Sequence, residues 1–501
     1  MEKVISIIWP IKKEELSKFV PMALILFLTI FNYNSLKAIK DSLVVPAVGA
    51  EALNFIKVYF VVPGAVLFVL LYMRLANRFF LRQIYLGIGI FYMIYFLLFA
   101  FVLYPYQDYI HPNPEAVHRL IHEKFHIFGY AVAFDHFKWF FLLYNKWLYV
   151  IFYVLAELWG SSMTFLLFWQ FSNQIVPTDQ SKRFYPMLNL FGSSGTFMAG
   201  ILIQYLVIGQ LNRVDDGKAL FVIQNMLTVL TISAFLILIV VLYIYRNLLN
   251  NQDLKKPNVP FKDIKKKLPF KESLRLVLSS RYLGYIVIMV LAYGISINLL
   301  EGPWKAKVKE LYPTTASYVQ FMGVINQWNG ALAIIFSLIG VLILKKYSWF
   351  AAAIVTPVMI FVTGVAFFSF VVFDNVASVV LDNFTLVSPL VMAVVLGGIQ
   401  NVLSKSSKYG LFDSTKEMTY IPIDEELKSK GKAAVDVIGA RAAKSGGAFI
   451  QSLLFMLFPA ATYTTISPIL MVILIIICII WILDVNLLNK AYLKFVNKNT
   501  D

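Results

Sequence analysis

Cysteine and charged residues are scarce in this sequence. It contains one cysteine, Cys478, and that residue lies within an apolar run, which excludes an intrachain disulfide and a metal cluster held by cysteines. Only 14% of the 501 residues are charged, whereas 59% are hydrophobic and the mean hydropathy is +0.73. Ordinary soluble domains are about 25% charged. The composition therefore excludes such a domain, indicates a polytopic membrane protein, and gives no reason to expect redox chemistry, a metal or a cofactor.

Apolar stretches long enough to cross a bilayer recur throughout the chain. A membrane-spanning helix needs about 20 predominantly apolar residues. By this criterion we predict twelve spans, and the first is expected to be an uncleaved helix because no small-residue cleavage site follows it. The predicted spans begin near Phe19, Tyr59, Tyr85, Trp147, Met187, Ala219, Leu283, Val319, Phe350, Leu386, Ala433 and Tyr463.

Acidic residues are few, and the basic residues are unevenly placed. The chain has 28 Asp and Glu against 44 Lys and Arg, for a formal net charge of +16. With the predicted spans, 30 of the basic residues fall on the side that holds both termini and 12 on the other side. Cytoplasmic loops of membrane proteins carry this excess. We therefore predict a multi-pass protein of the cell inner membrane with both termini in the cytoplasm, and we interpret the charge as topological and not as a nucleic-acid surface.

The longest polar break divides the predicted spans six and six. It is rich in lysine and proline and covers residues 246–282. Two six-helix bundles that rock about a site at the bilayer midplane are typical of transporters. We predict an all-α protein with an N-terminal bundle over residues 1–245, a basic cytoplasmic linker over 246–282 and a C-terminal bundle over 283–501.

A long loop on the outer side, residues 106–146, contains all five histidines. His118, His122 and His126 recur at every fourth residue, which on a helix would place them on one face. Such a row is compatible with a metal site, but no cysteine and no fixed carboxylate pattern accompanies it. An amphipathic helix with solvated histidines is the alternative interpretation, and the sequence leaves the choice open.

Charged residues inside the predicted spans are rare, and each needs an explanation because a charge at the bilayer centre costs roughly 3 kcal/mol or more. The segment AAVDVIGARAAKSGG carries Arg441 and Lys444 on one helix face. It is not a phosphate loop, because Ala443 stands where the required glycine would be. Two buried cations beside small residues favour an anion as ligand.

The other charges of this kind are Lys40, Asp41, Glu157, Glu301 and Lys305. A cation at a helix end is often a snorkelling anchor, an interpretation that suits Lys40 and Lys305 and fails for Glu157, which is flanked by apolar residues. We predict a shared cavity in which lysines hold a polyanion and are paired with carboxylates when the cavity is empty.

Two sets of uncharged residues accompany these charges. Gly192, Gly195 and Gly200 lie within one predicted span, where small residues let helices approach closely. Four aromatic residues near the charged segments could stack a base, although anchoring at the membrane interface is the alternative interpretation. These are Trp159, Trp169, Tyr293 and Trp304.

Several motifs together resemble the nucleotide transporter family, the ATP/ADP translocases of obligate intracellular bacteria and of plastids. The likeness extends from residue 31 through the last span. It is carried by AELWGSSMTFLLFWQFSNQI, KRFYP, YGISINLLEGPWKAKVKELYP, VLSKSSKYGLFDSTKEMTYIP and KGKAAVDVIGARAAKSGG. The resemblance implies a twelve-helix carrier similar to the major facilitator architecture and not an enzyme.

The resemblance also implies which residues bind substrate. The four charged positions that matter for transport in this family match Lys40, Glu157, Glu301 and Lys444, and Arg441 is a further candidate. The implied function is exchange of host ATP for bacterial ADP, with membrane lipid as the surroundings and with no nucleic acid and no obligate protein partner.

Alternatives to ATP/ADP exchange remain at this point. A relative of other specificity would move GTP and GDP, UTP or CTP, by net or proton-coupled uptake. A membrane-embedded enzyme acting on a phosphorylated lipid would need acid/base pairs or a metal triad at one interface, which the loops do not offer. A purely structural membrane protein would leave the intramembrane charges unexplained.

Overall fold

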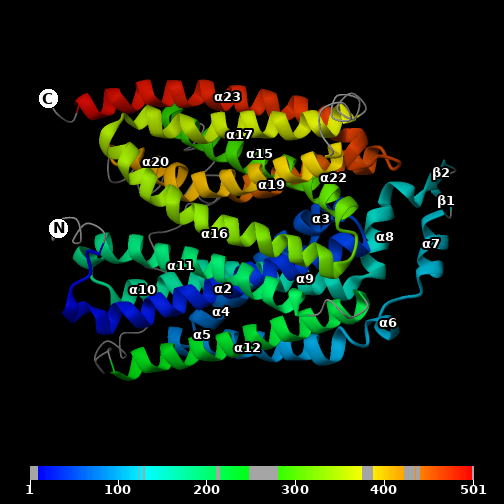
Figure 1. Cartoon of the computed structure of the whole chain (residues 1–501), viewed down its shortest axis with the longest axis horizontal. Coiled ribbons are helices and arrows are strands. Elements are labelled where there is room, and N and C mark those ends of the chain that lie inside the picture. Colours follow the sequence, from blue (N-terminus) through cyan, green and yellow to red (C-terminus); the bar gives the residue numbers. More distant parts are fainter. Residues whose placement is uncertain are drawn as a thin grey trace.

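A computed structural model describes residues 9–122, 124–127, 130–209, 215–247, 280–374, 387–422, 435 and 440–498. The molecule is an elongated bundle of long helices that run roughly side by side (Figure 1). Helix α2 (Leu16–Ala47) begins, and helix α23 (Tyr463–Lys498) ends, at the same end of the molecule. We call this the terminal end. The opposite end carries a small β-hairpin, and we call it the hairpin end.

The helices that precede residue 248 form the lower half of Figure 1, and we call them the N-terminal half. Several of its spans are continuous helices with an internal stretch of wider π-helical turns. After the short 3₁₀ turn η1 (Lys13–Glu15) and α2, the elements are α3 (Ala52–Phe55), η2 (Ile56–Val61), α4 (Val62–Ala76), α5 (Leu81–Leu98), η3 (Phe99–Leu103), α6 (Gln107–Ile110), α7 (Pro114–His122), β1 (Lys124–Ile127), β2 (Tyr130–Ala133), η4 (Phe134–Phe137), α8 (Lys138–Asn145), α9 (Trp147–Trp159), η5 (Gly160–Phe168), α10 (Trp169–Ile175), α11 (Thr178–Ile208) and α12 (Asp215–Asn247).

The helices after residue 279 form the upper half of Figure 1, and we call them the C-terminal half. In chain order they are α15 (Arg281–Leu311), α16 (Thr315–Lys346), α17 (Trp349–Val372), α19 (Pro389–Ser407), η6 (Lys408–Phe412), α20 (Asp413–Met418), α22 (Ala440–Leu457) and α23. The linker predicted over residues 246–282 lies almost entirely outside the described residues.

The predicted spans agree closely with these helices. Eleven of them are long and apolar enough to cross a membrane, and each overlaps a predicted span. The twelfth prediction, which begins near Ala433, coincides with the shorter apolar helix α22. Four spans of the C-terminal half begin at a hydroxyl residue that accepts a hydrogen bond from the backbone N–H three residues on, which satisfies donors that the helix itself leaves unpaired. These caps are Ser280, Thr314, Ser348 and Ser388.

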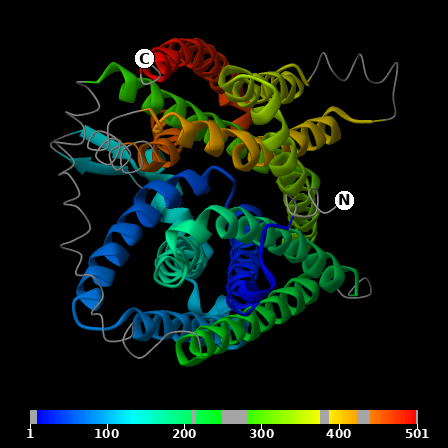
Figure 2. The same cartoon turned by 90° about the vertical axis from the view of Figure 1, so that its left-hand side faces the viewer.

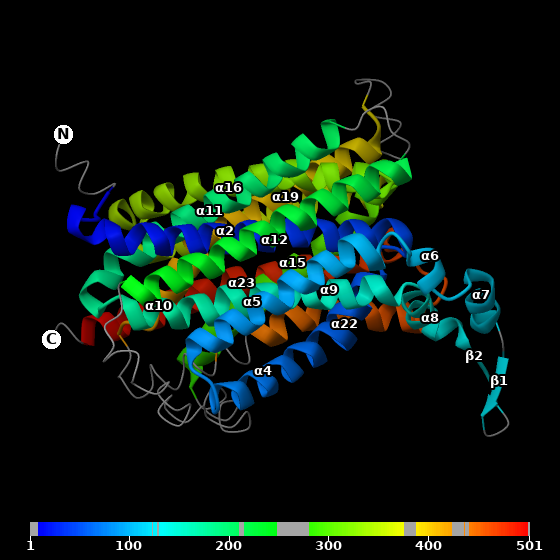
Figure 3. The ribbon, with the colours of Figure 1, turned by 90° about the horizontal axis from the view of Figure 1, so that it is seen from below.

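The predicted row of histidines is wrong as a single helix. His118 and His122 lie on α7, but the helix ends there and His126 lies on strand β1, which pairs antiparallel with β2. A strand places alternate residues on opposite faces, so the fourfold spacing no longer aligns the three residues. Figure 3 shows this hairpin projecting beyond the helix bundle. Among the described residues, no group of three or more His, Cys, Asp or Glu could hold a metal ion.

The two halves meet along α11 and α16 (Figure 2). A β-carbon on Gly200 would stand 2.5 Å from the carbonyl oxygen of Gly323 on α16, and one on Gly195 would stand 2.5 Å from that of Phe27 on α2. The glycines in this span therefore serve close helix packing, as predicted, because any side chain would push the neighbouring backbone away.

Hydrogen bonds between the halves gather toward the hairpin end. The side chain of Asn54 donates to the Tyr463 hydroxyl at 2.6 Å, and the Tyr463 N–H donates to Glu51 at 3.3 Å. Lys138 on α8 donates to the Pro459 carbonyl. Gln204, four residues before the end of α11, donates to the Gln320 carbonyl near the start of α16 at 2.6 Å. These bonds hold the halves together at the hairpin end.

Candidate substrate site

Six charged side chains form a continuous ion-pair network between the two halves. It lies nearer the hairpin end than the middle of the helices: Lys40 is seven residues before the end of α2, and Lys305 is six residues before the end of α15. Lys40 contacts Glu157 of α9 and Asp41 of α2, each at 3.0 Å. Asp41 accepts from Lys305 of α15 at 2.9 Å, which joins the halves. Lys305 also contacts Glu301 at 3.1 Å, one turn earlier on the same helix.

The network ends with a second connection between the halves. Lys57, in the π-helical turn η2, contacts Glu301 at 3.1 Å and donates to the Asn298 side chain at 3.3 Å. Lys57 is thus inside such a turn, and Glu157 lies three residues before another, η5. Wider turns of this kind often occur at functional sites because they redirect the side chains near them.

Three lysines and three carboxylates alternate along this network, so its formal charges cancel. The burial is deep: Lys40 is 1% exposed and Asp41 and Lys305 are each 2% exposed. The Lys40 ammonium also lies 3.6 Å from the centre of the Tyr153 ring, an attractive contact with the ring face. Removing one partner from such a group leaves an uncompensated buried charge, which is far more costly than losing a surface ion pair.

Three of the predicted site residues meet in this network: Lys40, Glu157 and Glu301. The interpretation of Lys40 and Lys305 as snorkelling anchors is wrong, because both side chains are directed into the protein and paired with carboxylates. The Glu157 side chain keeps 23% of its surface exposed, so the network is not sealed on every side.

Arg441 and Lys444 lie on α22, but their side chains are outside the described residues. The α22 backbone around them packs directly against α15. Gly294 of α15 faces Ala443, and a β-carbon on Gly447 would stand 2.7 Å from the Asn298 side chain. Gln451 of α22 donates to the Asn298 carbonyl at 2.9 Å. Helix α22, which carries Lys444, therefore packs beside α15, which carries Glu301. Glu301 is seven residues, or about 10 Å, further along α15 than Gly294.

Two of the aromatic residues considered for base stacking have structural roles instead. Trp159 is fully buried and its indole N–H donates to the Thr29 carbonyl at 3.1 Å. Trp304 is 2% exposed and donates to the Val394 carbonyl of α19 at 3.1 Å. Because both rings are enclosed and their only donors are used, neither face is free to stack a base.

Sequence reasoning missed Lys57 altogether and did not include Asp41 and Lys305 among the site residues. Lys57 interrupts the apolar run NFIKVYFVV at the start of the second span. A charge inside the membrane costs as much free energy at Lys57 as at Lys40. The criterion that identified Lys40 would therefore have identified Lys57 as well. The pairing of Lys305 with Asp41 has no sequence signal, since the two residues are 264 positions apart.

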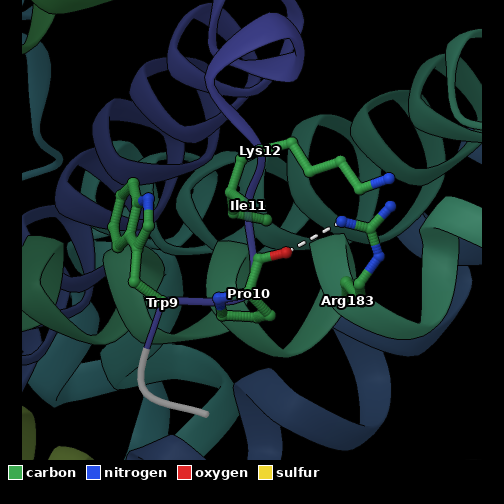
Figure 4. Close-up of a pocket in the computed structure, with 5 residues that line it drawn as sticks. All are labelled: Trp9, Pro10, Ile11, Lys12 and Arg183. Carbon is green, nitrogen blue, oxygen red and sulfur yellow. Dashed lines mark hydrogen bonds between the residues drawn. The ribbon is translucent and has the colours of Figure 1, made fainter. Parts of the chain in front are cut away.

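A pocket near the start of the chain is separate from this network. It is lined by Trp9, Pro10, Ile11, Lys12 and Arg183 (Figure 4). Arg183 donates to the Pro10 carbonyl at 2.8 Å and to both oxygens of Glu15 at 2.9 and 2.7 Å. This bidentate contact fastens the segment before α2 onto α11. The pocket is about 37 Å from Lys40 along α2, so it is not part of the ion-pair network.

Comparison with known proteins supplies the family. The family model described as TLC ATP/ADP transporter matches residues 1–492. The chain is 43% identical to ADP,ATP carrier protein 1 of Rickettsia typhi, over 99% of this chain and 97% of that protein. It is 44% identical to the protein of the same name from Rickettsia prowazekii, with the same coverage, and 42% identical to ADP,ATP carrier protein 3 of that organism, over 98% of each chain.

Solved structures share the fold at low sequence identity. A D-xylose-proton symporter aligns with a TM-score of 0.55 and 13% identity over 93% of this chain and 97% of its own. A bacterial homologue of the iron transporter ferroportin, in an inward-facing state, aligns with a TM-score of 0.56 and 14% identity over 92% of this chain and 98% of its own. The expected similarity to the major facilitator architecture is confirmed. With its family match over nearly all residues, this multi-pass membrane protein belongs to the TLC ATP/ADP transporter family.

Proposed function

We propose that this protein is an antiporter of the bacterial inner membrane that exchanges host ATP for bacterial ADP by alternating access. The observation that carries the proposal is the ion-pair network, in which Asp41–Lys305 and Lys57–Glu301 join the two halves. A phosphate chain is the kind of ligand that competes for such lysines. The names of the Rickettsia relatives supply the nucleotides.

The network gives exchange a physical reason. When no nucleotide is bound, the lysines are neutralised by Asp41, Glu157 and Glu301, so the resting carrier has no bare buried charge. A nucleotide that takes the lysines releases carboxylates from the contacts between the halves, which lowers the barrier between the inward and outward states. In this scheme Lys40 and Lys444 bind phosphates, with Arg441 as a further candidate, and Glu157 and Glu301 are their counter-charges.

The same scheme assigns the moving bodies. The bundle over residues 1–245 rocks against the bundle over residues 283–501, and residues 246–282 link them on the cytoplasmic side. Because the halves are bonded at the hairpin end and the excess of basic residues puts the terminal end in the cytoplasm, the described conformation is closed toward the outside. Nucleotide then enters this conformation from the cytoplasm.

The test is uptake of labelled ATP into proteoliposomes. We expect rapid uptake of labelled ATP into liposomes that contain ADP, and little uptake of labelled ATP into liposomes that contain no nucleotide. Unlabelled GTP, UTP, CTP and their diphosphates, added in turn, should compete much less than ATP and ADP. Uptake that is indifferent to internal nucleotide would exclude exchange, and equal competition by another base would assign a different substrate.

A further inference from the structure

Two further lysines lie near the network but outside it. Lys37 lies on α2, one turn before Lys40, and Lys405 lies on the last turn of α19 in the opposite half. Within the part of the chain that the structure describes, neither ammonium group forms an ion pair. The three lysines of the network each contact one or two carboxylates, so Lys37 and Lys405 differ from them in kind.

Lys37 and Lys405 repel each other electrostatically. Among side-chain charges Lys37 has the strongest effect on Lys405, the carboxylates of Glu301 and Asp41 act on it in the opposite sense, and both lysines act on Glu301. Lys405 is held in place by the side chain of Asn401, one turn earlier, which accepts from it at 2.8 Å. An amide oxygen orients an ammonium group but does not cancel its charge. Two cations that form no ion pair within the described residues therefore act on one region from opposite halves.

Both lysines lie on the terminal-end side of the network. Helix α2 runs toward the hairpin end, so Lys37 precedes Lys40 on the path from the terminal end. Helix α19 runs the other way. Its residue Val394 accepts a hydrogen bond from Trp304, the neighbour of Lys305 in the sequence, and Lys405 is eleven residues, or about 16 Å, further toward the terminal end. Both lysines are partly exposed, whereas Lys40 is enclosed. A solute that arrives from the terminal end meets them before it meets the network.

We propose that Lys37 and Lys405 form an anion subsite that takes the phosphate chain of an entering nucleotide before the ion-pair network opens. The inference rests on the proposed function and deepens it, because it separates a first binding step from the step that breaks ion pairs. Binding here relieves repulsion between two cations, whereas binding at Lys40 displaces Asp41 or Glu157. The subsite therefore fills first and brings the phosphates within reach of Lys40 and Lys305.

The test measures binding to the purified full-length protein. The variants are Lys37→Gln, Lys405→Gln and the double substitution, and the probes are ADP and pyrophosphate in titration calorimetry. We expect each single change to weaken binding of both probes about tenfold and the double change about a hundredfold, since each removes one charge-assisted contact. Lys37→Arg and Lys405→Arg should retain binding. Lys408→Gln is the matched control, because Lys408 is paired with Asp413 at 3.0 Å, and it should bind as the wild type does.

Thermal unfolding without ligand distinguishes a subsite from a structural role. Removing one of two cations that repel each other should leave the midpoint unchanged or raise it, while abolishing the stabilisation that pyrophosphate gives the wild type. A lowered midpoint in the glutamine variants, or pyrophosphate binding equal to that of the wild type, overturns the subsite. Exchange of ATP for ADP by the wild-type protein is measured separately. If the protein binds pyrophosphate through these lysines but does not exchange ATP for ADP, the subsite is supported and the proposed function is refuted.

Discussion

At the scale of single residues, the stability of the ion-pair network depends more on the order of its positive and negative side chains than on their number. Lys40 stands between Glu157 and Asp41, so it neutralises parts of two carboxylates at once. At the network's other end Lys57 has one carboxylate and one amide. Because the interior screens charge weakly, each member depends on its neighbours, and the effects of substitutions will not add.

Substituting Lys40→Gln should destabilise the protein strongly. The change leaves the buried carboxylate of Asp41 with only Lys305 and takes Lys40 away from Glu157, so we expect a loss of about 3–5 kcal/mol in unfolding free energy and loss of exchange. Adding Glu157→Gln to Lys40→Gln should recover part of that stability, because the carboxylate that Lys40 neutralised is then removed. A double-mutant cycle by thermal unfolding in detergent measures the coupling.

The control for this cycle is the pair of Lys307 with Glu310, at 2.8 Å, in which the Glu310 side chain keeps 46% of its surface exposed. Lys307→Gln, Glu310→Gln and their combination should change stability by less than about 1 kcal/mol, as surface ion pairs do. Additive effects of Lys40→Gln and Glu157→Gln, or losses as small as those of the control, would contradict the description of Lys40 and Glu157 as a coupled buried pair.

At the scale of elements, the short helix α6 is attached to the start of α9 on the hairpin side. Trp147 donates to the Ile110 carbonyl at 3.4 Å, and the Tyr149 hydroxyl donates to the Gln107 side chain. His111 follows α6 directly, and its ring meets the Tyr149 ring edge to face at 5.1 Å. Burial of the imidazole, together with the nearby Lys146 ammonium, lowers the pKa of His111 from 6.5 to about 4.

This pKa makes the attachment of α6 sensitive to pH. Neutral His111 is favoured in the folded state, so stability is complete above about pH 6.5 and is lost as pH falls from 6.5 toward 4, where the detached segment takes up a proton more readily. We expect hydrogen exchange of residues 107–111, corrected for the intrinsic effect of pH, to be roughly tenfold faster at pH 5 than at pH 7. His111→Gln is the matched control and should show no such change, and equal pH dependence in both proteins would refute the assignment.

The elements were predictable from the sequence, but their pairing was not. A run of apolar residues determines that a segment crosses the membrane, so the spans that begin at Trp147 and Tyr463 were located to the residue. The hairpin was missed because the fourfold spacing of histidines favours a helix. Lys40 and Glu157 were identified through the cost of an intramembrane charge, whereas the partner of Lys305 depends on how α2 and α15 pack, which no local pattern encodes.

At the scale of the whole molecule, polar contacts join the two halves in two layers, in addition to the packing of α11 against α16. One layer is the ion-pair network, and the other is the group of hydrogen bonds closer to the hairpin end, where Asn54 meets Tyr463 and Lys138 meets Pro459. The second layer contains the hydrogen bond between the neutral side chains of Asn54 and Tyr463, worth about 1 kcal/mol net, and two bonds that involve Lys138 or Glu51 and are worth about 1.5–3 kcal/mol each. Such bonds can be broken in a transport cycle without prohibitive cost, and only if the halves separate there can solute reach the network from the hairpin end.

Distances between spin labels should report this separation. The sole native cysteine, Cys478, is replaced by alanine, and labels are placed at the exposed positions Tyr144→Cys and Phe458→Cys at the hairpin end. Without nucleotide we expect one short distance, because these segments are bonded to each other through Lys138. Saturating ADP should add a second, longer population as carriers turn outward.

A second pair of labels tests whether the motion is reciprocal. Phe80→Cys and Tyr347→Cys lie at the terminal end, one in each half, and their distance should shorten in the same fraction of molecules in which the Tyr144–Phe458 distance lengthens. A pair within the N-terminal half, Phe80→Cys with Tyr243→Cys, is the control and should not change. If both ends widened together, or if ADP moved neither, the two halves would not be rocking about the ion-pair network, since closure at one end must accompany opening at the other when the network between them acts as the pivot.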